Sequence, residues 1–269
     1  MSYRIIWVTF ICVKQTTINF CDNIFFVKLK LVDIKQEAQG TKSFFWETQK
    51  EINYLPGQYF YFTLPKLNYP DSRGATRHFS LSSSPTEGKL IRCTTRIRQE
   101  SGYKKTLNEL SIGSEIEGEG PEGSYILDEK EKGPHVFLAG GIGITPFRSM
   151  IKYVFDKNLD IQIHLIYSNS IPEQIAFRKE LEDWTRKSDN FKLAMTISKP
   201  QESKEKWSGL SGRLDELMIK KLIENWKLEI KNLTFWLCGP PPMVDAMEQI
   251  MGKLKVSFGQ VRSEKFTGY

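Results

Sequence analysis

The sequence predicts a two-domain fold, in which a six-stranded antiparallel Greek-key barrel is followed by a parallel sheet covered by helices. Three observations support this prediction. The chain has 269 residues, a length that suits one or two domains. Its first half consists of short strand-like segments separated by turns. After Gly133, apolar strands alternate with helical stretches.

Six segments of the first half are rich in β-branched and aromatic residues and are bounded by Gly, Pro, Asn or Ser. These expected strands are 28–35, 43–47, 58–64, 77–82, 90–98 and 115–119. One short helix is expected at 104–110. Six short strands with few helices are typical of a small antiparallel barrel.

The second half shows continuous apolar runs separated by helical stretches. The expected strands are 135–139, 161–167, 192–197 and 234–238, and helices are expected to begin near Pro146, Pro172, Leu214 and Pro242. This alternation is typical of a parallel sheet buried on both faces. The charged stretch 128–133 is the expected linker, which divides the chain into domains 28–132 and 133–269. Residues 1–27 form an N-terminal extension of unknown role.

The net charge of +6 arises from 38 basic and 32 acidic residues that are spread along the chain. A nucleic-acid-binding protein usually concentrates its basic residues on one face, so no nucleic-acid partner is expected. A diffuse attraction for an acidic protein partner remains open. Cys12, Cys21, Cys93 and Cys238 show no CxxC spacing, which argues against a zinc site or a cysteine-ligated cluster. No metal is expected, and the scattered thiols favour a reducing, cytoplasmic location.

The apolar run 5–13 is too short to cross a bilayer, which needs about 20 residues. An extra strand or a loosely attached extension is the favoured interpretation. Contact with a membrane surface, an uncleaved signal and an incorrectly chosen start codon remain open alternatives.

A glycine-rich turn, Gly140-Gly141-Ile142-Gly143-Ile144-Thr145-Pro146, directly follows the first strand of the second half. Glycine permits positive φ and lets a ligand approach the backbone closely. Thr145 is expected to be the helix N-cap, and Pro146 suits the first helical turn. Free N–H groups and the helix dipole at this point form an anion site that suits a dinucleotide pyrophosphate.

The last expected strand ends in Cys238-Gly239-Pro240-Pro241-Pro242. The prolines prevent helix formation until the turn is complete, so they fix a rigid edge at the end of the strand. Ligands of parallel sheets bind at the carboxyl ends of the strands. The Cys238 thiol is therefore expected to face the same crevice as the glycine-rich turn.

A third motif, Arg77-His78-Phe79-Ser80, begins a strand of the barrel half. Strand alternation places Arg77 and Phe79 on one side, with His78 and Ser80 on the other. Arg77 suits charge-assisted bonds to a pyrophosphate. Phe79 offers a flat face to an isoalloxazine ring, and Ser80 is placed to reach the flavin N5.

These three motifs, in this order, resemble the ferredoxin–NADP reductase superfamily over about residues 28–269. The similarity is greatest to the compact flavodoxin/ferredoxin reductases and oxygenase reductase components. Cytochrome b5 reductases share the proline-rich Cys238 motif but usually carry Thr in place of Ser80. The resemblance implies an FAD-binding barrel, an NAD(P)-binding domain, and an oxidoreductase that moves hydride between NAD(P)H and FAD. A separate acidic carrier, such as a ferredoxin, a flavodoxin or an oxygenase component, would exchange single electrons with FAD.

The resemblance also assigns site residues. Those implied for the flavin are Arg77, His78, Phe79, Ser80, Thr94, Thr95, Arg96, Ser101, Gly102 and Thr106. Those implied for the pyridine nucleotide are Gly140, Gly141, Gly143, Ile144, Thr145, Pro146, Ser168, Cys238, Gly239 and Pro240. Four residues are implied in catalysis: Ser80 at N5, Cys238 at the nicotinamide, Tyr269 as a C-terminal aromatic lid, and Glu264 as a proton-handling carboxylate.

Departures from the family pattern leave several points open. Phe79 replaces the usual Tyr, and Ser170 stands where relatives often place Arg. Arg178 is a candidate for a nucleotide 2′-phosphate, although a solvated helix charge is favoured, so NADH and NADPH are not distinguished. The acceptor, the oligomeric state and the direction of electron flow are also open. The alternatives are an FAD-containing relay subunit of a larger complex, a cytochrome b5 reductase-like enzyme and a nucleotide-binding module without activity.

Overall fold

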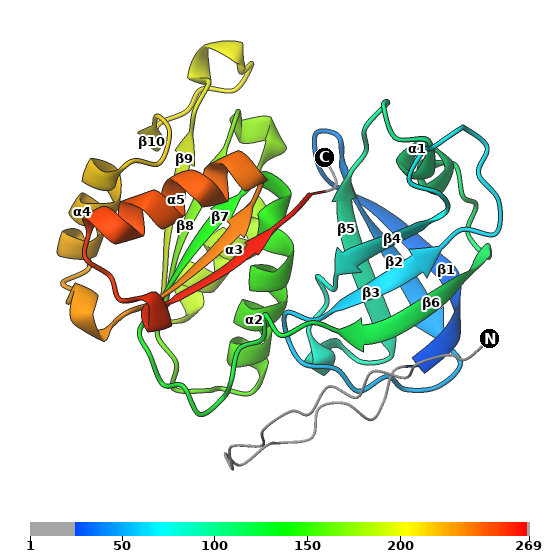
Figure 1. Cartoon of the computed structure of the whole chain (residues 1–269), viewed down its shortest axis with the longest axis horizontal. Coiled ribbons are helices and arrows are strands. Elements are labelled where there is room, and N and C mark those ends of the chain that lie inside the picture. Colours follow the sequence, from blue (N-terminus) through cyan, green and yellow to red (C-terminus); the bar gives the residue numbers. More distant parts are fainter. Residues whose placement is uncertain (1–24, 268–269) are drawn as a thin grey trace, which may run out of the picture.

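The computed structural model describes residues 25–267, in which a β-barrel lies beside an α/β sheet (Figure 1). The barrel strands are β1 (Phe25–Ala38), β2 (Thr41–Thr48), β3 (Tyr59–Thr63), β4 (Thr76–Ser80), β5 (Leu90–Arg96) and β6 (Glu115–Glu122). Their order is β4-β3-β6-β1-β2-β5, with antiparallel pairing throughout. Strands that are not consecutive, such as β2 and β5, are therefore neighbours, as in a Greek key.

The two strands at the ends of this order meet and close the barrel. An antiparallel bridge joins Leu81 to Cys93, and the Ser82 N–H donates to the Arg92 carbonyl at 2.8 Å. Alternation along β3 buries Phe60 and Phe62 inside the barrel. The helix α1 (Gly102–Asn108) lies between β5 and β6 in the chain. The predicted six-stranded antiparallel barrel is confirmed.

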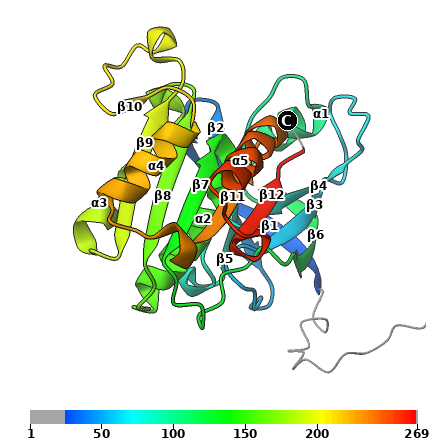
Figure 2. The same ribbon diagram turned by 60° about the vertical axis from the view of Figure 1, so that its left-hand side comes forward.

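The second sheet is parallel and has the order β10-β9-β8-β7-β11-β12. Its strands are β7 (His135–Gly140), β8 (Ile163–Asn169), β9 (Phe191–Ile197), β10 (Leu210–Ser211), β11 (Thr234–Gly239) and β12 (Val261–Lys265). The helices α2 (Ile144–Asp156) and α3 (Arg178–Lys187) cover one face. The helices α4 (Glu216–Asn225) and α5 (Pro241–Lys253) cover the other (Figure 2). The predicted parallel sheet with helices on both faces is confirmed.

Three details differ from the sequence-based expectation. The expected helix at Pro172 is only a 3-10 turn, Pro172–Gln174, because the left-handed conformation of Phe177 (φ 59°) separates it from α3. The short strand β10 and the edge strand β12 were not expected. Strand β12 has the sequence VRSEK, which contains no apolar run.

The start of the second unit is not marked by a change in packing. Tyr125 and Leu127 precede the predicted linker, yet both pack in the core of the parallel sheet. The Tyr125 hydroxyl also donates to the Leu237 carbonyl at 3.1 Å. The division of the chain at residues 132 and 133 therefore stays a prediction.

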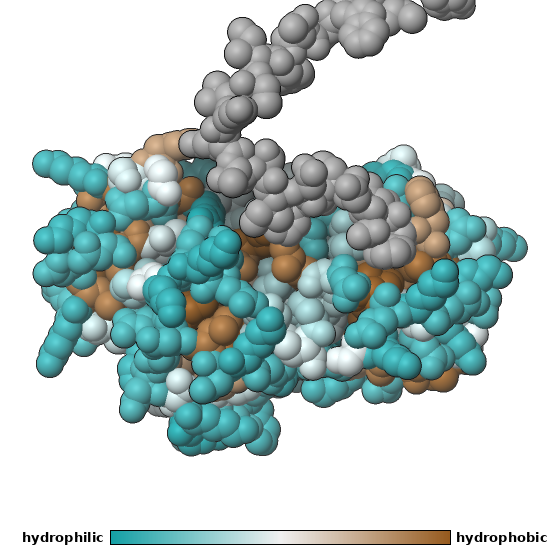
Figure 3. Space-filling view, turned by 90° about the horizontal axis from the view of Figure 1, so that it is seen from below, coloured by the Kyte–Doolittle hydropathy of each residue, from teal (hydrophilic) through white to brown (hydrophobic). Residues whose placement is uncertain are grey.

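Within residues 25–267, every helix is too short or too polar to cross a bilayer. On the face seen from below, hydrophilic side chains surround smaller hydrophobic groups (Figure 3). The apolar run 5–13 lies outside the described residues.

The chain reverses its direction of travel across the parallel sheet between β7 and β11. From β7 it moves outward through β8 and β9 to β10, and it then returns to β11 on the other side of β7. Such a switch point opens a crevice at the carboxyl ends of the two strands. The glycine-rich turn after β7 and the proline-rich turn after β11 both lie there.

These two turns touch through backbone atoms. A Cβ on Gly143 would lie 2.3 Å from the Cys238 carbonyl oxygen and 2.7 Å from the Gly239 Cα. A Cβ on Gly140 would lie 2.0 Å from the Met243 sulfur. Glycine is required at position 143 because backbone atoms block a Cβ there, whereas at position 140 a Cβ would have to displace the end of the Met243 side chain.

We expect Gly143→Ala to lower the free energy of unfolding by about 1–3 kcal/mol, because the added methyl group must displace backbone atoms. Gly252→Ala in α5 is the matched control, since a Cβ there would meet no described atom within 4 Å. The free energy of unfolding of the control is expected to rise by about 0.5–1 kcal/mol, because Ala has a higher helix propensity than Gly. Urea denaturation measures both, and equal stabilities for the two variants would contradict the packing argument.

Candidate functional site

A pocket lies between the barrel, the first turn of α2 and the segment that follows β12. In Figure 1 the segment after β12 leads from the parallel sheet toward the barrel. The lining residues are Arg73, Arg77, His78, Phe79, Ser80, Thr94, Thr95, Lys104, Ile142, Thr145, Phe266 and Thr267.

The motif of β4 forms one wall of this pocket. Arg77 and Phe79 both face Tyr103, whose ring centroid lies 5.1 Å from the Arg77 Cζ and 6.1 Å from the Phe79 ring. The His78 ring lies 5.3 Å from that of Tyr59 and is on the outer side of the strand. Ser80 is buried at the end of β4. Strand alternation thus separates His78 from Arg77 and Phe79, while all four motif residues line the pocket.

Asp71, which the sequence analysis did not single out, organises the loop before β4. Its Oδ1 accepts a bond from the Arg77 Nη2 at 2.5 Å, and its Oδ2 accepts from the Ser101 hydroxyl at 3.0 Å and the Tyr103 N–H at 2.9 Å. Burial opposes ionisation, but these donors and the Arg77 charge outweigh it and hold the pKa of Asp71 at about 2. Asp71 is therefore ionised, and it ties the guanidinium of Arg77 to the start of α1.

The other residues expected at α1 hold the same loop. The Ser101 hydroxyl accepts from the Lys104 N–H at 3.2 Å. The Thr106 hydroxyl donates to the Gly102 carbonyl at 2.9 Å and accepts from the Asn68 N–H at 3.0 Å. A Cβ on Gly102 would lie 2.2 Å from the carbonyl oxygen of Pro70. None of the three predicted residues lines the pocket, and their contact with a cofactor stays a prediction.

Basic side chains gather around the pocket although they are far apart in the sequence. Lys104 lines it with only 6% of its surface exposed. Burial, followed by the charges of Arg98, Arg73, Arg77 and Arg96, lowers the pKa of Lys104 to about 8. A concave surface with one sign of charge attracts anions. Arg73, Arg98 and Lys104 were missed because no local pattern links them.

Strand β5 forms the opposite part of the barrel wall. Thr94 and Thr95 are buried and line the pocket. The Thr94 Oγ1 lies 2.7 Å from the hydroxyl oxygens of both Ser43 and Ser82, so it is held within the barrel. The Arg96 Nη2 donates to the Gln174 Oε1 of the α/β half at 3.3 Å.

The glycine-rich turn contributes Ile142 and Thr145 to the pocket. The prediction that Thr145 caps α2 is wrong: Gly143 is the N-cap, and the Thr145 hydroxyl donates to the Ile142 carbonyl at 3.1 Å. The helix starts earlier because a 3-10 turn, Gly141–Gly143, leads directly into it. Gly141 adopts φ 52°, a left-handed conformation that favours glycine.

The other residues predicted for the nucleotide lie along the crevice beside the pocket. Ile144 and Pro146 are buried in the first turn of α2. Ser168, at the end of β8, pairs with Gly140. Next to it, Asn169 is 5% exposed, and its side-chain amide has no hydrogen-bond partner among the described residues. Asn169 was not among the predicted residues, because an Asn at a strand end has no distinctive pattern.

Cys238 and Glu264 lie side by side at the carboxyl ends of β11 and β12. Cys238 is completely buried, and burial together with the charge of Glu264 raises the pKa of its thiol well above the ordinary value. Burial alone raises the pKa of Glu264 to about 7, and its Oε2 has no hydrogen-bond partner in the described part of the chain. The pair supplies a neutral thiol and a carboxyl group that titrates near neutral pH.

The C-terminal segment brings an aromatic residue into the pocket, but it is Phe266. Phe266 and Thr267 line the pocket, and the Phe266 N–H donates to the Gly239 carbonyl at 2.9 Å. Tyr269, the predicted lid, lies outside the described residues. Cys238 does not line the pocket itself but adjoins it through Gly239 and Phe266.

The fold and the site define a two-domain protein with an anion-attracting pocket between a barrel and a nucleotide-binding type of sheet. Residues 137–249 match the family described as "Oxidoreductase NAD-binding domain". The chain is 26% identical over 241 residues to a glycine betaine monooxygenase reductase subunit of Chromohalobacter salexigens, a match that covers 88% of this chain and 63% of that protein. It is 30% identical over 179 residues to NADH-cytochrome b5 reductase 1 of Aspergillus oryzae, covering 64% and 59%.

Among solved structures, a ferredoxin NADP+ reductase from Neisseria gonorrhoeae with bound FAD and NADP superposes with a TM-score of 0.75. That match has 20% identity and covers 89% of this chain and 98% of that one. Residues 137–249 thus match an NAD-binding family, and the fold and the relatives support similarity to the ferredoxin–NADP reductase superfamily. It spans about 60% of the length of the two curated relatives named above.

Glu264 makes stability depend on pH. Its pKa is about 7 in the folded protein and 4.5 as the reference value, so its contribution is present at low pH and is lost as the pH rises through 7. Between pH 5 and pH 8, we expect the free energy of unfolding of Glu264→Gln to rise by on the order of 2 kcal/mol relative to that of the wild type. Urea denaturation at several pH values measures this, with Glu224→Gln on the exposed side of α4 as the control. Parallel pH profiles for wild type and Glu264→Gln would refute the assignment.

Proposed function

We propose that this chain is an FAD-dependent NAD(P)H oxidoreductase that exchanges electrons with a separate carrier. The observation that carries the proposal is the pocket itself. It joins the β4 motif, a cluster of basic side chains and the first turn of α2, and it lies beside the carboxyl ends of β7 and β11. In this proposal the barrel, residues 28–132, holds FAD, and residues 133–269 hold the nucleotide.

The pocket has the chemistry that FAD requires. Arg77 and Lys104 would hold the pyrophosphate, and Phe79 would support the ring system next to Ser80. When bound, FAD supplies the chemistry that protein side chains lack, since it accepts a hydride and releases electrons singly. The protein supplies binding, orientation and a buried environment.

The crevice beside the pocket would hold the pyridine nucleotide. The turn Gly140–Gly143 and the first turn of α2 offer backbone N–H groups to its pyrophosphate. The thiol of Cys238 stays neutral because of its burial, so it would pack against a nicotinamide without placing charge there. Glu264 would hold or release a proton near neutral pH at the same strand ends.

An electron carrier in another protein is the proposed partner. The net charge of +6 favours an acidic carrier, such as a ferredoxin, a flavodoxin or an oxygenase component. The relative named as a monooxygenase reductase subunit supports this choice. The relative named as a cytochrome b5 reductase supports cytochrome b5 as a second candidate acceptor. The alternative is a relay subunit of a larger complex. Such a subunit would differ from the proposed enzyme because, when purified alone, it would not react with free nucleotide.

We expect the purified yellow protein to lose its flavin absorbance near 450 nm when it is mixed anaerobically with NADH or NADPH. The reason is that the proposed FAD site, the pocket, lies next to the proposed nucleotide site, the crevice. Stopped-flow absorbance measures the rate for each nucleotide and so identifies the preferred one. A flavin that stays oxidised with both nucleotides would refute the proposed function, and a colourless protein from flavin-replete cells would refute the cofactor.

We expect Lys104→Met to weaken FAD binding by about 10- to 100-fold, since it removes a charge-assisted bond to phosphate. The pKa of Lys104 is about 8, so wild-type affinity should fall above pH 8 as the amine loses its charge. The variant should lose this pH dependence. Flavin fluorescence titration of the apoprotein measures both effects. Lys105→Met, which alters the next residue of α1 outside the pocket, is the control, and an equal loss in both variants would contradict the assignment.

A further inference from the structure

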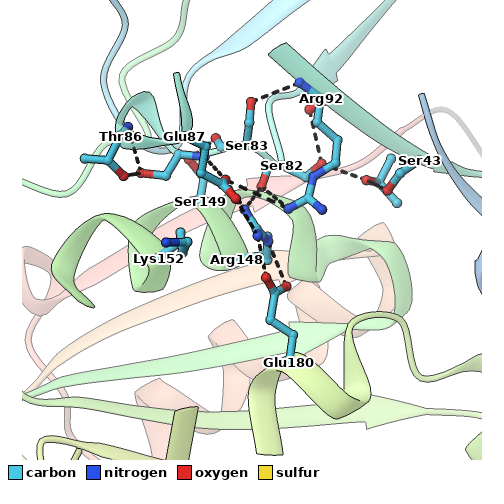
Figure 4. A network of polar contacts seen from close by, with 12 residues as sticks. Ser43, Ser82, Ser83, Thr86, Glu87, Arg92, Arg148, Ser149, Lys152 and Glu180 are labelled. Atoms are coloured by element: carbon cyan, nitrogen blue, oxygen red, sulfur yellow. Dashed lines mark hydrogen bonds and ion pairs between the residues drawn. The ribbon is translucent and has the colours of Figure 1, made fainter. Parts of the chain in front are cut away.

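A buried arginine joins the two halves of the molecule close to the pocket. Arg148 lies on α2 with 2% of its surface exposed. Its Nη1 donates to the Ser82 carbonyl at 2.9 Å and bonds Glu87, its Nη2 bonds Glu87 at 2.8 Å and Glu180, and its Nε donates to Glu180 at 2.9 Å. Figure 4 shows the guanidinium between the two carboxylates. All of its N–H groups are thus directed at fixed acceptors.

The partners of Arg148 come from both halves of the molecule. Ser82 and Glu87 belong to the barrel segment between β4 and β5, and Glu180 belongs to α3. The neighbouring Ser149 hydroxyl donates to the Ser83 carbonyl at 2.6 Å. Two consecutive residues of α2 are therefore bonded to two consecutive carbonyls of the barrel.

We call the bonds that Arg148 and Ser149 make to the barrel and to α3 the joint. Further charged and aromatic groups surround it. Arg92 of β5 lies 4.0 Å from Glu87 and 3.8 Å from Glu37. The Phe177 ring lies 5.3 Å from the Arg92 Cζ and 5.9 Å from that of Arg148, so both guanidinium groups are close to the same ring. Positive and negative groups alternate through the joint. A planar guanidinium matches two carboxylates at once, which a lysine ammonium does not.

The position of the joint relative to the pocket gives it a consequence for the reaction. Ser82 follows the pocket residue Ser80 by two positions, and Arg148 follows the pocket residue Thr145 by three, which is one helical turn. Ser80 belongs to the flavin wall and Thr145 to the nucleotide turn. A change in the bonds of Arg148 would therefore move one wall relative to the other.

We propose that Arg148 is a positioning residue, which sets the separation between the nucleotide turn after β7 and the flavin wall at β4. This inference rests on the proposed function. Hydride transfer requires reacting atoms about 3–3.5 Å apart, and a displacement of about 1 Å can cost a factor of about 100 in rate. A nucleotide held by the turn would not contact Arg148, which is 2% exposed, so we expect its affinity not to depend on the joint. Arg148 acts on the rate of transfer through the distance between the walls.

The test compares Arg148→Lys with Arg186→Lys. Arg186 on α3 also pairs with a carboxylate, Asp183, but this partner lies on the same helix of the α/β half. In anaerobic stopped-flow reduction, we expect Arg148→Lys to lower the limiting rate about tenfold or more per bound FAD. Its half-saturating nucleotide concentration should stay within about threefold of the wild type. Arg186→Lys should match the wild type in both quantities.

Hydrogen–deuterium exchange of the apoprotein supplies a readout that does not depend on activity. We expect Arg148→Lys to speed exchange in residues 81–88 and 144–150 and to leave β8 and β9 unchanged. Ser149→Ala, which removes one bond of the joint, should show a smaller change in the same two segments. Should Arg148→Lys fail to fold, Glu180→Gln takes its place, because it weakens the same joint and keeps a hydrogen-bond acceptor.

The outcomes are distinguishable. An Arg148→Lys protein that melts at a lower temperature but reduces bound FAD within about twofold of the control would overturn the inference, since Arg148 would then serve stability alone. Unchanged exchange in both segments would also overturn it. A wild-type flavin that neither nucleotide reduces would instead refute the proposed function. The exchange experiment would then still decide whether Arg148 holds the two segments together.

Discussion

The contact between the turns after β7 and β11 is the constraint on which the site depends. Gly143 lies against the carbonyl of Cys238, and Gly140 leaves room only for the side chain of Met243. This contact directs the start of α2 toward the barrel and places Gly239 where its carbonyl accepts the N–H of Phe266. One close backbone approach therefore determines both the nucleotide turn and the direction of the C-terminal segment.

The two sides of the site differ in charge. The barrel side of the pocket gathers basic groups. Burial, followed by repulsion from the neighbouring arginines, lowers the pKa of Lys104, and an anionic ligand would relieve this repulsion. Asp71 offsets part of that repulsion at Arg77 and orders the loop before β4. The sheet side holds the Cys238 thiol, which burial keeps neutral, and Glu264, whose pKa burial raises to about 7. In the proposed function, the basic side would bind phosphate and the sheet side would bind the nicotinamide.

Much of the architecture was predictable because it follows from the local pattern of apolar and polar residues. The alternation of β3 and β4 and the apolar runs of β7, β8 and β11 locate these strands to within a few residues. The strand β12 escaped notice because an edge strand of polar residues has no apolar run. The start of α2 was placed too late, since the 3-10 turn before it depends on glycine packing against β11 and not on a capping side chain.

The sequence by itself determined the fold class, the family resemblance and the two turns of the crevice, because these depend on residues that are neighbours in the chain. Only the tertiary structure brought Lys104 to Arg77, Phe266 to the pocket, and Arg148 to Glu87 and Glu180. These contacts join residues separated by long stretches of chain, and a single side chain carries no local mark of its distant partner. Burial, which shifts the pKa of Glu264 and Lys104, likewise exists only once the domains have packed.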